Sequence, residues 1–235
     1  MTERLYGLDS YMKEFDAVVA GVLPDQNAIV LDRTAFYPGG GGQPSDLGSI
    51  SGQALRAVRT VAGEVQHVLS GALPDVGTAV HGVLDWDRRF QLMRTHTAMH
   101  VLCGVVFRDH GALVTGGEMQ PLHGRMDFEF ARLERDLVSE IEASVNQEIA
   151  AARAVEVKIL PRDEAFKIPD LIRTKINLLP SGITEVRTVE IVGLDLQADG
   201  GTHVRNTAEV GRIRVVDYKS KGAINKRIYI EVEDR

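Results

Sequence analysis

Two histidine-containing segments carry the residue types of a metal site. His96 and His100 are four residues apart, a spacing that places both imidazoles on one face of a helix and lets them reach one ion. A second segment, Asp199–His203, offers a carboxylate and a third imidazole across two glycines that permit close backbone approach. Three imidazoles and one carboxylate are a suitable tetrahedral set for zinc. The alternative is that these are core or surface histidines that bind no metal.

A run of four glycines precedes Gln43 in the segment Phe36–Gly48. Such a run costs backbone entropy and weakens a strand, so a purely structural turn seldom needs it. No Gly-Lys-Ser/Thr follows, so the run is not a P-loop, and it does not match the dinucleotide-binding fingerprint. The backbone N–H groups of Gly40, Gly41 and Gly42 could hold a phosphate or an RNA end. A β-bulge or a tight hairpin is the alternative.

The charge of the chain is unevenly distributed. The net charge is −6, yet the segment Arg212–Arg227 carries six bases and one acid. An acidic chain does not favour indiscriminate binding of nucleic acid, but a basic stretch can direct one polyanion to one place. We expect four of these residues to contact RNA phosphates: Lys219, Lys221, Lys226 and Arg227. The alternative is a solvated strand surface.

No arrangement typical of a side-chain nucleophile, Ser-His-Asp or Cys-His, is evident. The single cysteine, Cys103, lies in a helical register beside apolar residues, so we expect a buried packing thiol. One cysteine excludes an intramolecular disulfide and fits a reducing compartment, which favours a cytoplasmic protein. The N-terminus has no basic region followed by an apolar core, so we expect no secretory signal.

The first third of the chain predicts β structure. Of the 235 residues, 44% are apolar and 26% charged, as in soluble globular proteins. No apolar run approaches the ~20 residues that a membrane-spanning helix needs. Short strand-like runs separated by Gly and Pro turns favour a small β-barrel or sandwich over residues 1–85. These runs are Ala17–Val22, Asn27–Leu31, Ser49–Val61, Val65–Leu69 and Thr78–Leu84.

The pattern changes near residue 85, where we place a domain boundary. Helical periodicity follows from Arg88 to about Phe107 and again over Glu134–Ala152. Strands are expected at Arg125–Phe130, Val155–Leu160, Val186–Val192, Val210–Val216 and Arg227–Val232. Helices and strands without regular alternation predict an α+β domain over residues 86–235.

Taken together and in this order, the segments resemble the free-standing alanyl-tRNA editing proteins, which are related to the editing domain of alanyl-tRNA synthetase. The resemblance covers nearly the whole chain. Its motifs are Leu5-Tyr6, Asp9–Tyr11, Phe36–Gly48, His96–His100, Arg125–Phe128, Gly200–Val204, Asn206-Thr207, Glu209–Gly211, Lys219–Gly222 and Arg227-Ile228. It implies an N-terminal β-barrel domain in residues 1–85. Residues 86–235 would form a zinc-binding editing domain of the threonyl/alanyl-tRNA synthetase second-additional-domain type.

The reaction that the resemblance implies is hydrolysis, without ATP, of mischarged tRNA(Ala), chiefly the seryl ester and in some members the glycyl one. No aminoacylation domain precedes the match, so we expect a trans-acting editor. Its partner would be the acceptor end of tRNA(Ala), with no membrane and no obligatory protein partner. One Zn²⁺ per chain would be held by His96, His100, Asp199 and His203. Two alternatives stay open: a weak or inactive tRNA-binding zinc protein, and an editor of another tRNA such as Ser-tRNA(Thr).

Two positions depart from the family's pattern. The family usually has cysteine where this chain has Asp199, and a carboxylate is a harder and shorter zinc ligand, at ~2.0–2.2 Å. Asp199 could bind zinc directly, bind it through water, or assist the attacking water; the carbonyl oxygen of Gln197 is a further candidate ligand. Met99 stands where synthetase editing domains often carry threonine. Thr115 is the nearest replacement hydroxyl, and Thr115 and Gln43 complete the candidate catalytic set as partners for a serine hydroxyl.

Overall fold

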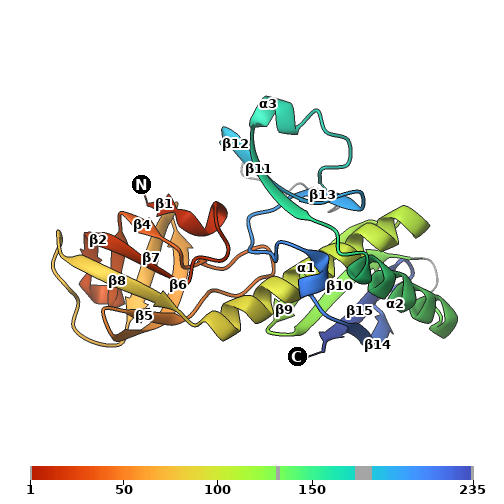
Figure 1. Cartoon of the computed structure of the whole chain (residues 1–235), viewed down its shortest axis with the longest axis horizontal. Coiled ribbons are helices and arrows are strands. Elements are labelled where there is room, and N and C mark those ends of the chain that lie inside the picture. The colour runs from red at the N-terminus through yellow and green to blue at the C-terminus, as the bar shows by residue number, and fades with distance from the viewer. Residues whose placement is uncertain (1, 131–132, 173–181, 234–235) are drawn as a thin grey trace. The chain divides into compact units, whose positions relative to one another are not determined.

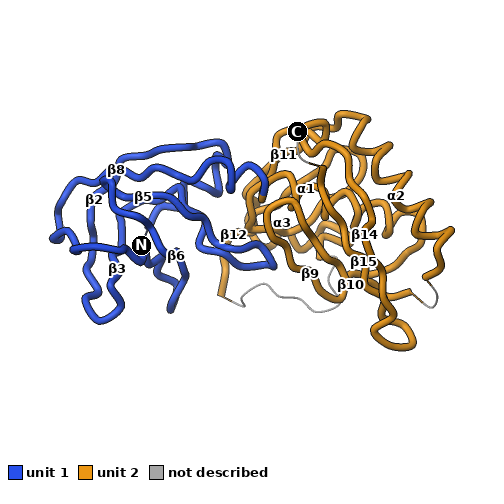
Figure 2. The backbone as a smooth tube through the Cα atoms, turned by 90° about the horizontal axis from the view of Figure 1, so that it is seen from below, with its two compact units in different colours: residues 1–91 blue, residues 92–235 orange. Residues whose placement is uncertain are grey.

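The chain divides into two compact units, residues 1–91 and residues 92–235 (Figure 2). The structure, a computed structural model, describes residues 2–130, 133–172 and 182–233. The boundary between the two units along the chain falls within helix α1 (Trp86–His110), whereas the change of sequence pattern at residue 85 marks the beginning of that helix. Within the described residues, none of the helices combines the length and apolarity needed to cross a bilayer.

Unit 1 consists mainly of antiparallel strands that pair in the order β2-β3-β7-β6-β5-β8 (Figure 1). Because β8 also pairs with β2, this sheet closes into a barrel. Two further short strands, β1 and β4, pair in parallel beside it. The strands are β1 Glu3–Arg4, β2 Glu14–Leu23, β3 Ala28–Leu31, β4 Arg33–Thr34, β5 Gly48–Ile50, β6 Gln53–Val61, β7 Glu64–Leu69 and β8 Ala79–Leu84.

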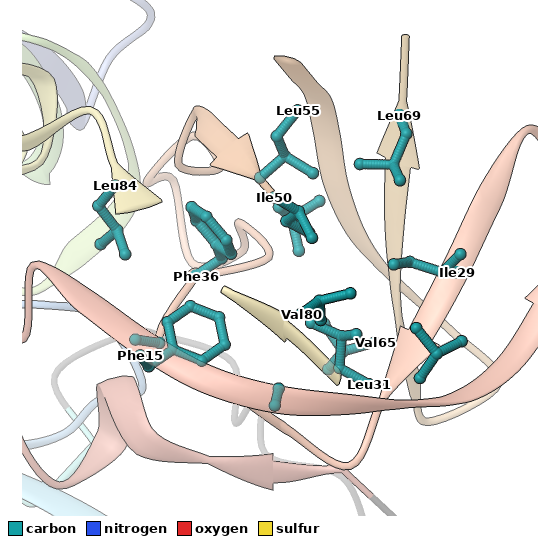
Figure 3. Packing of buried hydrophobic residues seen from close by; sticks show 14 residues of the cluster. Phe15, Ile29, Leu31, Phe36, Ile50, Leu55, Val65, Leu69, Val80 and Leu84 are labelled. Carbon is teal, nitrogen blue, oxygen red and sulfur yellow. The ribbon is translucent and has the colours of Figure 1, made fainter. Parts of the chain in front are cut away.

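Side chains of alternate strand residues fill the interior of unit 1. In β2, burial alternates from Glu14 onward, so that Phe15 and Val19 face the core while their neighbours are exposed. Figure 3 shows Phe36, which lies outside the regular strands, among the strand side chains. Each such side chain contributes about 1.5–3 kcal/mol when it leaves water. The apolar interior is therefore the main stabilising term for unit 1.

The segment Ser49–Val61, predicted to be one strand, is a hairpin. The chain turns at Ser51 and Gly52, whose φ angles are 49° and 81°. Two consecutive residues with positive φ are typical of the type I′ turns that connect antiparallel strands. Ser-Gly is a weaker signal for this turn than Asn-Gly, which explains why the prediction was wrong here.

A buried ion pair holds the glycine-rich segment to the first turn of α1 within unit 1. The Arg89 side chain is fully buried, and its Nε donates to both Asp46 oxygens, at 2.9 and 3.1 Å. Nη1 donates to the Ser10 carbonyl at 2.9 Å, and Nη2 donates to Asp46 and to the Ala35 carbonyl. Asp46 also accepts from the backbone N–H of Tyr37 at 2.6 Å. Nε and Nη2 of this arginine thus fix the two ends of residues 35–46, while Nη1 holds Ser10.

Unit 2 combines α1 with helix α2 (Arg135–Ala150) and two antiparallel sheets (Figure 1). The first sheet has the order β14-β15-β10-β9 and the second the order β11-β12-β13. Their strands are β9 Val114–Gln120, β10 His123–Glu129, β11 Val155–Pro161, β12 Glu185–Ile191, β13 Asp195–Ala198, β14 Ile213–Ser220 and β15 Asn225–Val232; a short helix, α3, spans Arg162–Ala165. The mixture of helices and strands predicted for this region is confirmed, and β9 and β13 are strands that the prediction missed.

Helix α1 forms the centre of unit 2. Every residue from Leu92 to Val106 is buried, so this part of the helix has no solvent-facing side. A helix buried all round belongs to the interior of a domain. It nevertheless carries polar side chains inside the core: Arg94, Thr95, His96, Thr97 and His100. Buried polar groups need partners, so these residues must have structural or chemical roles.

The interior of unit 1 contains a buried histidine that predicts acid sensitivity. Nε2 of His67 lies 2.9 Å from Thr34 Oγ1, and burial lowers the pKa of His67 to about 4. The unfolded histidine titrates near 6.5, so between pH 6.5 and 4 the unfolded chain binds more protons and stability is lost as the pH falls. We expect this residue to remove about 2 kcal/mol from the free energy of unfolding between pH 7.5 and 5. Urea unfolding followed by Trp86 fluorescence measures it.

The variant His67→Leu should abolish that part of the pH dependence. His81, in the same unit, is exposed, and its contact with Asp16 raises its pKa. His81→Ala is therefore the control and should retain the loss of stability below pH 6.5. An unchanged pH dependence in His67→Leu would contradict the assignment.

Candidate metal centre

Four residues of unit 2 bring potential metal ligands together. One ligand atom from each of His96, His100, Asp199 and His203 lies within 4.8 Å of the others. The three imidazole rings are in mutual contact, with centroid separations of 5.0 Å (His96–His100), 4.2 Å (His96–His203) and 4.7 Å (His100–His203). The structure thus brings together the two segments singled out in the sequence, and all three histidines are buried.

Helix α1 supplies two of the four residues by simple periodicity. His96 and His100 are one turn apart on the buried helix, so both imidazoles lie on the same face. Between them, Thr97 connects the helix to the second segment: its Oγ1 lies 3.2 Å from His203 Nδ1 and accepts from the backbone N–H of Val204 at 3.2 Å. A single hydroxyl therefore aligns the third imidazole with the first two.

The segment after β13 supplies the other two residues through a tight turn. Asp199 Oδ2 accepts from the backbone N–H of Gly201 at 2.7 Å and lies 3.0 Å from His203 Nε2. Asp199 Oδ1 lies 3.6 Å from His96 Nε2. The side chain of Arg187, on β12, donates to the carbonyl of Asp199 at 2.9 Å and lies 3.8 Å from its carboxylate. The carboxylate thus faces the imidazoles, while an arginine holds the backbone behind it.

The protonation states in this cluster suit a cation. Burial lowers the pKa of His96 well below its ordinary value and that of His203 to about 4, so both imidazoles are neutral at pH 7. Burial opposes ionisation of Asp199, but the neighbouring imidazoles, His96 first, outweigh it and hold its pKa well below the usual range. Burial opposes protonation of His100, but its contact with Asp195 and the charge of Asp199 together outweigh burial and raise its pKa. Imidazole nitrogens around an ionised carboxylate are a donor set that suits a divalent metal ion, which binds the neutral form of the imidazole.

Two predicted catalytic residues lie outside this cluster. The hydroxyl of Thr115, on β9, donates to Asn225 Oδ1 at 3.1 Å and is exposed. Gln43 belongs to unit 1, where it is buried and its backbone exchanges two 3.0 Å hydrogen bonds with Gly40. Both assignments stay predictions. Gln197, considered as a further ligand, directs its amide nitrogen to Asp195 at 2.6 Å and to Cys103 Sγ at 3.3 Å. Cys103 is buried, as expected of a packing thiol.

The glycine-rich segment forms a tight turn whose middle is exposed. All four glycines have positive φ, between 58° and 129°, which only glycine adopts readily. Gly40 and Gly41 are exposed, and nothing lies within 4 Å of where a Cβ on Gly41 would be. The hairpin considered in the sequence is thus present, and within it the N–H of Gly40 donates to the carbonyl of Gln43 at 3.0 Å. The phosphate contact assigned to Gly40, Gly41 and Gly42 stays a prediction.

The basic C-terminal residues have different environments. Lys219 and Lys221 are exposed, as a phosphate-binding surface requires. Lys226 is only 6% exposed and donates to the carbonyls of Gly222 and Ala223, at 2.7 and 2.9 Å. The expectation of a free Lys226 ammonium on that surface is therefore wrong: β15 places this side chain on the same buried face as Ile228.

Arg227 is committed to an ion pair. Its Nε and Nη2 donate to the two oxygens of Asp127 at 2.6 and 2.7 Å. The guanidinium also lies 5.9 Å from the ring centroid of Tyr229. An RNA phosphate at this position would have to share the arginine with Asp127. Its assignment to RNA binding stays a prediction.

Sequence reasoning missed three residues around the cluster. Arg187 and Thr97 hold the loop, as described above, and Asp195 Oδ2 lies 3.3 Å from His100 Nδ1. Asp195 has one signal in the sequence, a lone acid between apolar residues shortly before the Asp199–His203 segment. Arg187 and Thr97 have no such signal in the sequence, since Arg187 fits an ordinary strand and Thr97 an ordinary helix.

Comparison with known families agrees with the site. Residues 186–229 match the model of the threonyl and alanyl tRNA synthetase second additional domain, and residues 5–88 match that of the class II (A) tRNA synthetases. The buried histidine cluster and these matches define a protein of the synthetase-related editing class.

Similarity to whole proteins is more specific. The chain is 39% identical, over the full length of both, to the alanyl-tRNA editing protein AlaX-M of Methanosarcina barkeri. It is also 39% identical to the AlaX-M protein of Saccharolobus solfataricus, over 99% of this chain and 100% of that one. To the alanine–tRNA ligase of Ignicoccus hospitalis it is 39% identical over 92% of its own length, but it spans only 24% of that ligase. The chain belongs to the AlaX-M family of alanyl-tRNA editing proteins, which confirms the resemblance seen in the sequence.

The position of Asp199 predicts a direct effect on metal binding. We expect the purified protein to hold about one metal ion per chain, and Asp199→Ala to bind it at least about 100-fold more weakly, because the loss of a ligand exceeds the loss of an outer-shell partner. Asp199→Cys restores an anionic ligand and should retain the metal. Elemental analysis and competition with a chelator measure both.

Asp217→Ala, which removes an exposed carboxylate of the same unit, is the control and should bind as the wild type does. Full metal retention in Asp199→Ala would refute the ligand role. Loss of turnover alone in that variant would instead indicate that Asp199 assists the attacking water.

Proposed function

We propose that this protein hydrolyses mischarged tRNA(Ala) in trans, with the seryl ester as its main substrate and the glycyl ester as its second. The observation that carries the proposal is the cluster of three buried histidines and one ionised aspartate in a chain of the AlaX-M family. The metal that suits this donor set is zinc, because imidazole and carboxylate in a four-residue site are typical zinc ligands. We accordingly assign one Zn²⁺ to His96, His100, Asp199 and His203.

The chemistry needed is modest, since an aminoacyl ester is already activated. Bound zinc would supply a Lewis acid that polarises the ester carbonyl and lowers the pKa of a water molecule. The chain's own contribution is to keep the imidazoles of His96 and His203 neutral by burial and to hold Asp199 ionised beside them. Thr97 and Arg187 fix the backbone that carries His203 and Asp199, so the donor atoms require little rearrangement.

Recognition of serine requires a hydrogen-bond partner for its hydroxyl. Met99 does not offer one: its thioether packs into the sheet, where a Cβ on Gly124 would come within 2.9 Å of Sδ and a Cβ on Gly117 within 3.2 Å of Cε. We assign the polar contact to Thr115 and Gln43, which also complete the catalytic set with Asp199. A site that binds a hydroxyl rejects the analogue that lacks it far more strongly than an apolar pocket rejects an added hydroxyl. Alanyl-tRNA(Ala) would thereby be spared.

Binding of the tRNA is assigned to backbone contacts. Lys219 and Lys221 would contact phosphates, and the exposed glycine backbone of Gly40, Gly41 and Gly42 would contact the acceptor end. Arg227 would also contact a phosphate while it stays paired with Asp127. Such contacts orient an RNA but carry no sequence information.

Deacylation assays test the proposal directly. The zinc-loaded protein should release serine from Ser-tRNA(Ala), release glycine more slowly from Gly-tRNA(Ala), and leave Ala-tRNA(Ala) intact. Hydrolysis of Ser-tRNA(Thr) at an equal rate would indicate an editor of another tRNA. Binding of tRNA and zinc without turnover would indicate the inactive zinc protein, the alternative that the replacement of the family's cysteine by Asp199 favours.

Neutralising the two exposed lysines should weaken tRNA binding through lost phosphate contacts. We expect Lys219→Gln combined with Lys221→Gln to reduce the slope of log K against log salt by about 2, roughly one per phosphate contact. Fluorescence titrations with tRNA(Ala) at several salt concentrations measure the slope.

The matched control is Lys158→Gln on β11. The Lys158 side chain is 56% exposed and that of Lys219 57%, and each lysine pairs with an acid. Lys158→Gln should leave both affinity and slope unchanged. If the double lysine variant had the same tRNA affinity and the same salt slope as the wild type, the alternative of a solvated strand surface would be favoured.

A further inference from the structure

A fully buried carboxylate lies directly behind one of the four cluster residues. The side chain of Asp195, at the beginning of β13, has no solvent exposure, and its Oδ2 lies 3.3 Å from Nδ1 of His100. The family models and the names of the relatives assign this residue no role. A carboxylate withdrawn from water is costly unless it is paired, so its place beside an imidazole nitrogen needs an explanation.

The helix is shaped to let this carboxylate approach. Gly104 lies one turn after His100 on α1, and a Cβ at that position would come within 2.9 Å of Leu194 Cγ and 3.0 Å of Asp195 Cβ. Any larger residue would push the beginning of β13 away from the helix. Glycine inside a helix costs about 1 kcal/mol of stability relative to alanine. The close packing of β13 against the helix at Gly104 offsets this cost.

A second contact fixes the orientation of the carboxylate. Gln197 Nε2 donates to Asp195 Oδ2 at 2.6 Å and also lies 3.3 Å from Cys103 Sγ on α1. The oxygen nearest His100 is therefore held on the other side by an amide that the helix itself positions. A carboxylate held in this way cannot turn away from the imidazole without breaking the bond to Gln197.

We propose that Asp195 is a positioning residue: it accepts the Nδ1–H of His100 and so leaves Nε2 of that histidine to bind the metal. The other histidines are consistent with this arrangement. His96 and His203 present Nε2 to Asp199, and Nδ1 of His203 faces Thr97. A carboxylate behind a ligand histidine fixes its tautomer and ring orientation and raises its basicity, which strengthens its bond to a metal. The inference rests on the proposed metal centre, and it concerns a residue that does not touch the metal.

Metal affinity of the full-length protein, measured by competition with a chelator for Zn²⁺, is the primary test. Asp195→Ala should bind Zn²⁺ about 10–100-fold more weakly than the wild type, the range typical of such partners. Asp195→Asn keeps an oxygen that can accept the Nδ1–H, so its affinity for Zn²⁺ should fall less than that of Asp195→Ala. The visible absorption spectrum of the Co²⁺-substituted protein should change in Asp195→Ala and be largely restored in Asp195→Asn. If Asp195→Ala does not fold, the loss in Asp195→Asn is the measured quantity.

Two further measurements separate positioning from general stability. Glu148→Gln neutralises another buried carboxylate of unit 2, held by Arg108 and Arg153, and should leave Zn²⁺ affinity and the Co²⁺ spectrum unchanged. In a His100→Ala background, the further change Asp195→Ala should produce no additional loss of affinity, since the residue acts through His100. An equal loss with and without His100 would overturn the proposal.

The possible failures are distinguishable. A wild-type protein that binds no Zn²⁺ would overturn the proposed metal centre together with this inference. If the wild type binds Zn²⁺ and both Asp195→Ala and Asp195→Asn bind it as tightly as the wild type does, only the role of Asp195 would be overturned.

Discussion

A carboxylate buried among three imidazoles is the interaction on which unit 2 depends. An ionised group in the protein interior is tolerated only with partners. Arg187, 3.8 Å from the Asp199 carboxylate, is one such partner, whereas the neutral imidazoles of His96 and His203 add no charge. A divalent cation would add positive charge there and would use the nitrogen lone pairs that burial keeps unprotonated on these two histidines. For this to work, the donor atoms must be held close together by something rigid. A helix buried on all sides is that support, because His96 and His100 cannot move apart without moving the core.

Unit 1 also contains a buried carboxylate that needs a partner, and there a protein side chain provides it. Its buried arginine, Arg89, neutralises Asp46 directly and satisfies its remaining donors with the carbonyls of Ser10 and Ala35. No ligand is needed there, because the donors and acceptors are matched within the unit. The comparison explains why one buried polar cluster is structural and the other is a candidate binding site. In the first, the arginine satisfies the carboxylate through direct hydrogen bonds. In the second, Arg187 lies 3.8 Å from the Asp199 carboxylate, and the clustered imidazole nitrogens still offer ligand atoms for a cation.

The elements that sequence reasoning predicted best are the two long helices. Helix α2 follows from the spacing of its apolar residues. Helix α1 has little amphipathic periodicity because it is buried on all sides, but its length and the histidine pair one turn apart were predicted. Strand β9 was missed because its two glycines break the pattern. The structure shows the reason for one of them: the Met99 side chain occupies the space beside Gly117, as it does beside Gly124 on β10. Lys226 was placed wrongly although its signal was present. It has the same parity as Ile228 and Ile230 in β15, and strand alternation therefore places it on the buried face.

Asp199 illustrates why a ligand substitution cannot be judged from charge alone. A cysteine at this position, usual in the family, would keep the negative charge, but a carboxylate has a second role that follows from its two oxygens. Oδ2 accepts from the N–H of Gly201, while the carbonyl of the same residue accepts from Arg187. Sulfur is a weak acceptor, so a cysteine here would hold the turn less firmly. The residue that completes the donor set is therefore also the one that shapes the loop carrying His203, which couples the loop conformation to the geometry of the cluster.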